Sequence, residues 1–188
     1  MAYKNEKRGT KVKILAFGAS YSKHSINKQF AIYVARLFEN HSIEVLDLNE
    51  FYLPLFTVDI EAENGHPELA KKFVRKLENA DFIIISLSEH NGSYNSAFKN
   101  LFDWASRIKQ QMFENKKLLL LSTSPGGRGG ANVLATALER FPRHGATILG
   151  SFSFPDFPQN FNENEGITNN ALKEKLLELI DAIKINLQ

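Results

Sequence analysis

Short, nearly continuous apolar runs alternate along this chain with longer segments of helical periodicity. Two runs, residues 81–86 and 117–123, are too short for buried helices and too uniformly apolar for strands with one wet face. Strands covered by helices on both faces have this composition, so we expect these two runs at the centre of a sheet. Further strands are predicted over residues 12–17, 43–48 and 147–152.

The segments between these runs carry apolar residues at spacings of three and four, the pattern of a helix with one buried face. The predicted helices are residues 26–40, 67–79, 97–108, 131–143 and 170–187. Strict alternation of strand and helix predicts a parallel sheet with right-handed crossovers and helices on both faces. Ligands bind such sheets beyond the carboxyl ends of the strands, so the loops after the first, third and fourth strands are the candidate site.

Composition narrows the classes of function. A chain of 188 residues, with 43% hydrophobic and 23% charged residues, fits one ordinary globular domain. The absence of cysteine excludes disulfides, thiolate metal sites and a cysteine nucleophile, so redox chemistry would need a bound cofactor. A formal charge of +2 gives no bulk electrostatic reason to expect nucleic acid. The histidines lack the spacing of metal ligands, so we expect them on the surface and expect no metal site.

The first ten residues are polar and are expected to form a flexible tail, followed by a single domain over residues 11–188. No signal-like apolar segment precedes the first strand, and no stretch approaches the length of a membrane span. The sequence therefore predicts a cytoplasmic protein without a membrane partner.

The first candidate loop, residues 18–27, runs from the first strand into the first helix. It carries four hydrogen-bonding side chains, and a helix N-terminus adds free N–H groups and partial positive charge, so the loop suits a phosphate. A single serine such as Ser25 would more simply cap the helix. The loop lacks the glycine pattern of a dinucleotide fold, the lysine of a Walker loop and the last glycine of a G-x-S-x-G nucleophile elbow.

The second and third loops are rich in glycine and polar residues. Residues 88–94 suit contact with a flat heteroaromatic ring, although Asn91 and Gly92 are equally typical of a surface turn. Residues 124–130 place four glycines around Arg128, which indicates unusual dihedrals or close backbone approach. Contact of Arg128 with a ligand's anionic part, with a neighbouring subunit or only with solvent remains open.

Together the three loops resemble the NADPH-dependent FMN reductase family, over most of the chain. The family's phosphate loop, G-S-x-R-x-x-S-x-N, is matched at Ser20, Ser25 and Asn27. Its flavin loop, P-E-Y-N-G-S followed by K-N and D-W, and its T-S-P-G-G-x-G-G element are matched at residues 88–93, 99–100, 103–104 and 123–130. The chain departs from these motifs at Ser22, Ser88 and His90, where the family has arginine, proline and tyrosine. Loss of this arginine is expected to weaken FMN binding, and the adjacent basic residues Lys23 and His24 are candidates to replace it in part as point charges.

The resemblance implies an α/β flavodoxin-like three-layer sandwich with a five-stranded parallel sheet in the order 2-1-3-4-5. It implies an FMN-dependent oxidoreductase that takes electrons from NADPH or NADH and passes them to flavin, quinone, azo or similar small-molecule acceptors. No catalytic side chain is implied, because the flavin carries the hydride. A homodimer or homotetramer is expected, and apolar residues of the 97–108 helix belong to the core or to a subunit interface. The alternative is a non-enzymatic flavodoxin-like module that binds FMN weakly or has lost it.

The FMN contacts implied by the resemblance fall into three groups. The residues expected to hold the phosphate are Ser20, Ser22, Ser25, Ile26 and Asn27. The residues expected to line the isoalloxazine are Glu89, His90, Asn91, Gly92 and Ser93. The residues expected at the other flavin edge or along the ribityl chain are Ser124, Gly126, Gly127 and Arg128.

Overall fold

The structure, a computed structural model, describes residues 11–187 and has one central parallel sheet. The strands are β1 (Lys13–Ala19), β2 (Ser42–Val45), β3 (Phe82–Leu87), β6 (Lys116–Thr123) and β7 (Ala146–Phe154). Their spatial order, β2-β1-β3-β6-β7, confirms the predicted order. The predicted tail, residues 1–10, lies outside the described residues.

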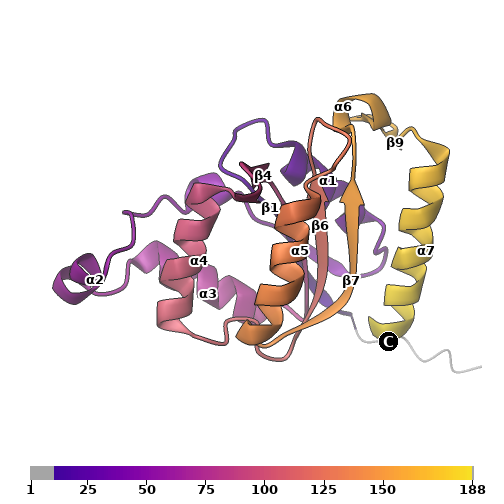
Figure 1. Cartoon of the computed structure of the whole chain (residues 1–188). Helices are drawn as coiled ribbons and strands as arrows, with labels where there is room; N and C mark the ends of the chain where they lie inside the picture. The colour runs from indigo at the N-terminus through magenta and orange to yellow at the C-terminus, as the bar shows by residue number, and fades with distance from the viewer. Residues whose placement is uncertain (1–10, 188) are drawn as a thin grey trace, which may run out of the picture.

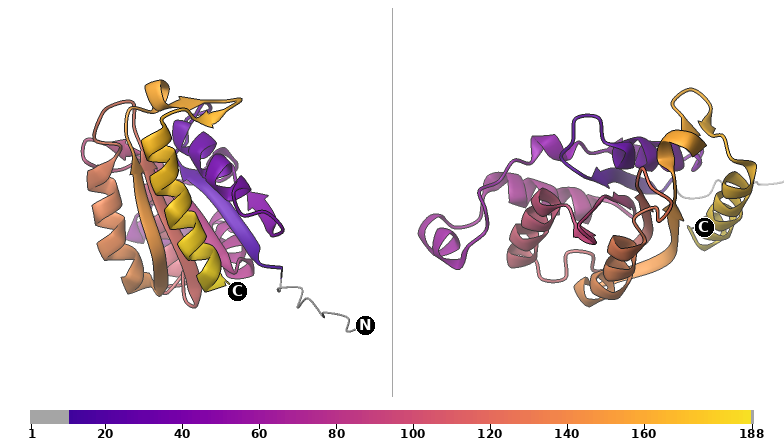
Figure 2. Two further views of the ribbon diagram at one scale, coloured as in Figure 1. Left: turned by 90° about the vertical axis from the view of Figure 1, so that its right-hand side faces the viewer. Right: turned by 45° about the horizontal axis from the view of Figure 1, so that its top comes forward.

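Helices cover both faces of the sheet and give the predicted three layers (Figures 1 and 2). One face carries α1 (Ile26–Arg36) and α7 (Asn170–Leu187), and the other carries α3 (Glu68–Asn79), α4 (Ser96–Ile108) and α5 (Ala131–Arg140). Side chains of β3 alternate between the layers, because Phe82 and Ile84 pack toward α1 while Ile83 and Ile85 pack toward α3 and α4. All four are buried, so the central position of this strand is confirmed.

Three predicted elements end earlier than expected. The first helix stops at Arg36, and the strand predicted over residues 43–48 stops at Val45. Asp47 then caps a short 3-10 turn, η1 (Leu48–Glu50). The helix predicted to reach residue 143 ends at Arg140 and continues as a 3-10 turn, η2 (Phe141–His144). Pro142 explains this end, because it supplies no N–H to continue the α-helical hydrogen bonds.

Several short elements were not predicted from the sequence. They are helix α2 (Val58–Asn64), the hairpin of β4 (Glu89–His90) and β5 (Ser93–Tyr94), helix α6 (Phe157–Asn160), and the paired strands β8 (Phe161–Asn162) and β9 (Gly166–Ile167). In Figure 1, α2 projects away from the sheet, beyond α4. Within residues 11–187, no helix has both the length and the apolar composition to cross a membrane.

The expectation that the histidines lie on the surface is wrong for His144. This residue is buried, and its ring packs edge-on against Phe102 with 4.8 Å between ring centroids. Its Nδ1 lies 2.6 Å from the carbonyl oxygen of Gln110, which requires a hydrogen on Nδ1. On α4, Phe98, Phe102 and their apolar neighbours are buried within this chain, so they belong to its core.

Candidate functional site

A hollow of about 250 Å³ lies where the loops after β1, β3 and β6 meet at the carboxyl edge of the sheet. It brings together every predicted residue of the first loop, two of the second and one of the third. Its lining is Ser20, Ser22, His24, Ser25, Ile26, Asn27, Ser88, Glu89, His90, Thr123, Ser124 and Pro125. Segments far apart in the sequence therefore meet at the carboxyl edge of the sheet, where parallel sheets bind ligands.

The first loop presents the N-terminus of α1 to this hollow. Ser25 is the N-cap, since its Oγ accepts a hydrogen bond from the N–H of Lys28 at 3.2 Å. The capping reading of Ser25 is thus correct, yet its hydroxyl hydrogen stays available to a ligand. In the described chain, no protein acceptor is bonded to the N–H groups of Ile26 and Asn27. These free donors and the helix dipole suit an anion.

Asn27 has a structural role that the sequence did not reveal. Its Oδ1 accepts hydrogen bonds from the Ser86 hydroxyl at 2.7 Å and from the Thr123 N–H at 3.1 Å. Its Nδ2 donates to the Thr123 carbonyl at 3.1 Å, so one buried amide fastens α1 to both β3 and β6. The second N–H of that amide is the group left for a phosphate, and such a contact stays a prediction.

Two bonds of the second loop fix it to its neighbours. The Ser88 hydroxyl donates to the carbonyl of Ala19 at 2.8 Å, which ties this loop to the end of β1. The Glu89 carboxylate accepts from the N–H of Val133, in the first turn of α5, at 3.0 Å. A carboxylate is well placed there because the helix N-terminus carries partial positive charge. Glu89 therefore joins the second loop to the helix that follows the third.

The tip of the second loop is a tight hairpin turn. Asn91 and Gly92 both have positive φ, 50° and 74°, as the common two-residue hairpin turn requires. Asn91, Gly92 and Ser93 are exposed and do not line the hollow, whereas His90 does. The turn predicted as one reading of this segment is present, and contact of its tip with a flavin stays a prediction.

The glycines of the third loop divide into two kinds. Gly129 has φ of 57°, and a Cβ there would lie 2.5 Å from the Ser153 hydroxyl oxygen, so the fold itself requires glycine. At Gly126 a Cβ would meet nothing within 4 Å, and at Gly127 it would meet only the Asp156 carboxylate at ordinary contact distance. These two positions expose backbone to open space, as close approach of a ligand needs.

Arg128 is exposed at the end of this loop and donates to the side chain of Asn132 at 2.8 Å. It does not line the hollow. Lys28, near the first loop, is also engaged, since its Nζ lies 2.6 Å from a carboxylate oxygen of Asp47. The hydrogen bond from Lys28 holds the pKa of Asp47 below its ordinary value. The exposed side chains of Lys23 and His24 are the remaining basic groups of the loop, and His24 lines the hollow.

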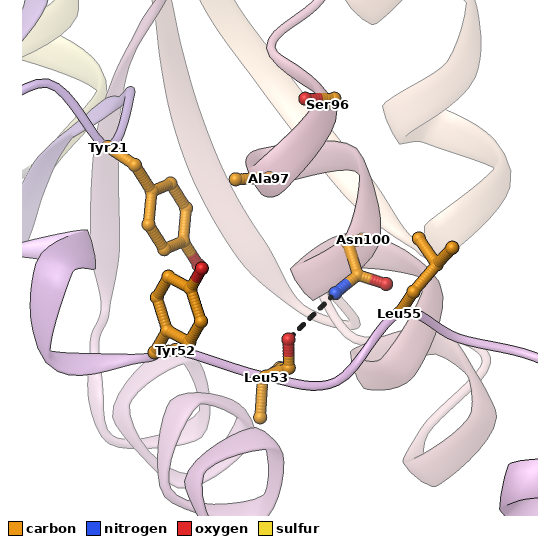
Figure 3. Close-up of a pocket in the computed structure, with 7 residues that line it drawn as sticks. All are labelled: Tyr21, Tyr52, Leu53, Leu55, Ser96, Ala97 and Asn100. Atoms are coloured by element: carbon orange, nitrogen blue, oxygen red, sulfur yellow. Dashed lines mark hydrogen bonds between the residues drawn. The ribbon is translucent and has the colours of Figure 1, made fainter.

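A second hollow, of about 280 Å³, adjoins the first loop at Tyr21 (Figure 3). One wall is an extended segment, residues 52–56, which we call the strap, and the other is the start of α4. The Tyr21 hydroxyl donates to the Phe51 carbonyl at 3.0 Å, and burial raises the pKa of Tyr21 to about 12. Sequence reasoning did not single out this tyrosine.

The K-N and D-W motif residues on α4 hold the strap by its backbone. Asn100 donates to the Pro54 carbonyl at 2.9 Å and accepts from the Phe56 N–H at 2.8 Å. The indole N–H of Trp104 donates to the same Pro54 carbonyl at 2.8 Å. These bonds give Asn100 and Trp104 a structural role. The sequence contained the motif but did not reveal this role. Lys99 and Asp103, the other residues of the motif, pair with each other at 2.7 Å.

In the described part of the chain, no group of three or more histidine or acidic side chains is placed to hold a metal ion. The hollow instead offers neutral hydroxyls and free helix amides, and the open glycine backbone of Gly126 and Gly127 follows directly after its last lining residues. That donor set fits the phosphate and ribityl groups of FMN, and the protein class defined by fold and site is a flavodoxin-like flavin-binding protein.

The family model for NADPH-dependent FMN reductases matches residues 12–159, and the chain belongs to this family of FMN- and NAD(P)H-using oxidoreductases. A quinone reductase of Escherichia coli K12 is 33% identical over 79 residues, which are 42% of each chain, so the alignment spans less than half of that relative. An NADPH:quinone oxidoreductase of Arabidopsis thaliana is 30% identical over 153 residues, 78% of this chain and 76% of the relative. Among solved structures, the flavoenzyme FerB of Paracoccus denitrificans, an NAD(P)H:(acceptor) oxidoreductase, matches with a TM-score of 0.73 and 22% identity, covering 92% of this chain and 97% of that one.

Proposed function

We propose that this protein is an FMN-dependent NAD(P)H oxidoreductase that reduces flavin, quinone, azo or similar small-molecule acceptors. The observation that carries the proposal is the hollow at the carboxyl edge, where the unbonded N-terminal amides of α1 belong to residues that share one cavity with residues of the second and third loops. Relatives named as quinone reductases support the same class of acceptor.

The proposed cofactor contacts follow the three loops. Ser20, Ser22, Ser25 and the amides of Ile26 and Asn27 would hold the phosphate at the start of α1. His90 and the Asn91–Ser93 tip would border the isoalloxazine, and Glu89 would act as a positioning residue through its bond to α5. Ser124, Gly126, Gly127 and Arg128 would lie along the ribityl chain or the opposite flavin edge.

The chemistry that FMN supplies when bound is uptake of two electrons from NAD(P)H and their release to an acceptor. This chain's residues bind and orient the cofactor. Because neutral hydroxyls and helix amides form most of the phosphate site, binding relies on hydrogen bonds more than on paired charges. The protein thereby departs from the family's phosphate-loop motif, which has an arginine at the position of Ser22.

The first experiment is an absorption spectrum of the purified protein with added FMN, followed by NADPH without oxygen. Flavin bands that shift on binding and then bleach would support the reductase. Flavin that binds without bleaching or turnover of a dye acceptor would favour the non-enzymatic module, for which the departure at Ser22 is the motivating observation.

The substitution Ser22→Arg sharpens this test. It restores the cation of the family motif, so we expect FMN to bind about tenfold more tightly, in line with a charge-assisted hydrogen bond of about 1.5 kcal/mol. Flavin fluorescence titration measures the change. Ser151→Arg, on the exposed part of β7, is the matched control and should leave FMN affinity unchanged. Weaker binding in Ser22→Arg would contradict the phosphate placement.

The remaining parts of the proposal rest on sequence alone. They are a cytoplasmic location, a single FMN-binding domain over residues 11–188, and a homodimer or homotetramer. Partners are proposed to be small electron acceptors, with no role for nucleic acid or membrane.

A further inference from the structure

The dipeptide Asn-Gly occurs twice in this chain, at Asn64–Gly65 and at Asn91–Gly92. Asparagine is a thermolabile residue, because the backbone nitrogen of the residue that follows can attack its side-chain amide. Glycine favours this attack most, since it has no Cβ to hinder the approach and reaches most backbone conformations. Both pairs have this chemistry, so the structure around each pair determines which of them reacts.

The pair Asn64–Gly65 ends α2. The N–H of Gly65 donates a hydrogen bond to the carbonyl oxygen of Glu61 at 2.9 Å, which continues the helical pattern by one residue. The glycine nitrogen must lose its proton before it can attack, and a proton held in this bond is shielded from base in the solvent. The end of the helix therefore protects Asn64.

The pair Asn91–Gly92 forms the tip of the β4–β5 hairpin, and both residues are exposed. Among residues 11–187, no acceptor is bonded to the N–H of Gly92. A Cβ placed on Gly92 would meet only Nδ2 of Asn132, at 3.7 Å, so little is packed over this part of the backbone. The attacking nitrogen is therefore free and open to solvent.

The hairpin is also built so that its tip can open. Only two residue pairs join its strands, Glu89 with Tyr94 and His90 with Ser93, and so short a hairpin is marginally stable in water. The bond from the Glu89 carboxylate to α5 fixes the base of the loop. Local opening of the tip, which costs far less than unfolding the domain, lets the Asn91 side chain turn toward the Gly92 nitrogen.

We propose that Asn91 is a site of spontaneous deamidation and that Asn64 is protected. The Gly92 nitrogen forms a bond to Cγ of Asn91, the bond from Cγ to Nδ2 breaks, and ammonia leaves with the proton that the nitrogen gave up. Water then opens the five-membered imide at either of its carbonyls, which gives aspartate or isoaspartate. Each product is one mass unit heavier and carries a new carboxylate, and isoaspartate adds a carbon to the backbone of the turn.

The consequence for FMN rests on the proposed function, in which the Asn91–Ser93 tip borders the isoalloxazine. A new negative charge and a longer turn would weaken binding of FMN by the modified loop. Bound FMN would in turn cover the tip and slow the reaction. The deamidation itself requires no cofactor, so its chemistry is independent of the reductase activity.

The test follows both asparagines in the full-length protein, without FMN, at mildly alkaline pH. Peptide mapping by mass spectrometry measures the products at Asn91 and Asn64 over time. Asn91 should react about fivefold faster or more, which is the factor that one net hydrogen bond contributes. In concentrated urea the two rates should approach each other, because the Gly65 bond and the hairpin are both lost. Equal rates in the folded protein, or an Asn91 that reacts only in urea, would overturn the proposal.

The matched variant is Asn91→Gly, which removes the side-chain amide but keeps a residue that accepts the positive φ of this turn. It should abolish the product at the hairpin and leave the rate at Asn64 unchanged, and circular dichroism checks that it is folded. Saturating FMN should slow the reaction at Asn91 alone. Without such protection the contact between tip and flavin would be contradicted, whereas the rates measured without FMN decide the deamidation by themselves.

Discussion

The loops around the hollow differ from residues 52–66, the strap followed by α2, which we call the arm, in how their polar groups are satisfied. Around the hollow, Asn27, Ser88 and Glu89 each bond to a different strand or helix, so the loops are fixed before any ligand binds. In the arm, α2 is tied to the body mainly through Glu61. The contrast indicates that the hollow is rigidly built by bonds between distant segments, whereas α2 depends on few contacts with the rest of its chain.

The largest expected effect is on stability, and it comes from replacing Asn27, which bonds to both β3 and β6. Asn27→Leu leaves the buried Ser86 hydroxyl and Thr123 amide without their partner, and should lower the free energy of unfolding by about 3 kcal/mol. Denaturant unfolding followed by circular dichroism measures it. Asn79→Leu, exposed at the end of α3, is the control and should change stability by less than about 0.5 kcal/mol. A loss for Asn27→Leu as small as the control's would show that the loops do not depend on this clamp.

Two substitutions of Ser25 separate its capping role from ligand binding. Ser25→Ala should cost about 1 kcal/mol of stability, but Ser25→Gly only a few tenths, because glycine is tolerated at the N-cap. Both remove the hydroxyl donor, so both should weaken FMN by about 1 kcal/mol in a fluorescence titration. If affinity instead followed stability, and Ser25→Gly bound FMN normally, the hydroxyl would have no contact with the phosphate.

A smaller, local effect is expected in the arm at acid pH. The hydrogen bond from Arg107 lowers the pKa of Glu61 below 4.5 in the folded protein. The stability that this pairing gives α2 is present above that ordinary value and is lost as the pH falls through the lowered folded pKa. Hydrogen exchange of α2 amides should accelerate over that range while exchange in β3 does not change. Glu61→Gln should show the fast exchange already at neutral pH; equal protection at both pH values would mean that the pairing of Glu61 with Arg107 does not hold α2.

The central sheet was predictable because its signal is local. Nearly continuous apolar runs such as residues 117–123 determine which strands are covered on both faces, and alternation with helices determines that they are parallel. The convergence of the three loops followed from the same topology. Helix ends were less predictable, since the stop at Arg140 depends on a single proline two residues later.

The parts that sequence did not reveal depend on partners far along the chain. Asn27 and Glu89 were expected to contact a flavin, and their bonds to Thr123 and Val133 became visible only with the fold. Helix α2 was missed because its seven residues include three acids and lack a buried face, so periodicity carries no signal there. His144 illustrates the same limit, since its buried ring is hydrogen-bonded to Gln110, 34 residues earlier, while its Nε2 has no partner among the described residues.

The strap beside the hollow of Figure 3 is held by hydrogen bonds to its own backbone, supplied by Asn100 and Trp104. Its path is therefore determined by side chains of α4, and the exposed side chain of Leu55 has little part in maintaining it, whereas Leu53 packs against the core. Mutations at Leu55 can alter the shape and polarity of the hollow while the backbone stays in place. The preference of this hollow for one small molecule over another can therefore change during evolution, or be redesigned, with little effect on folding.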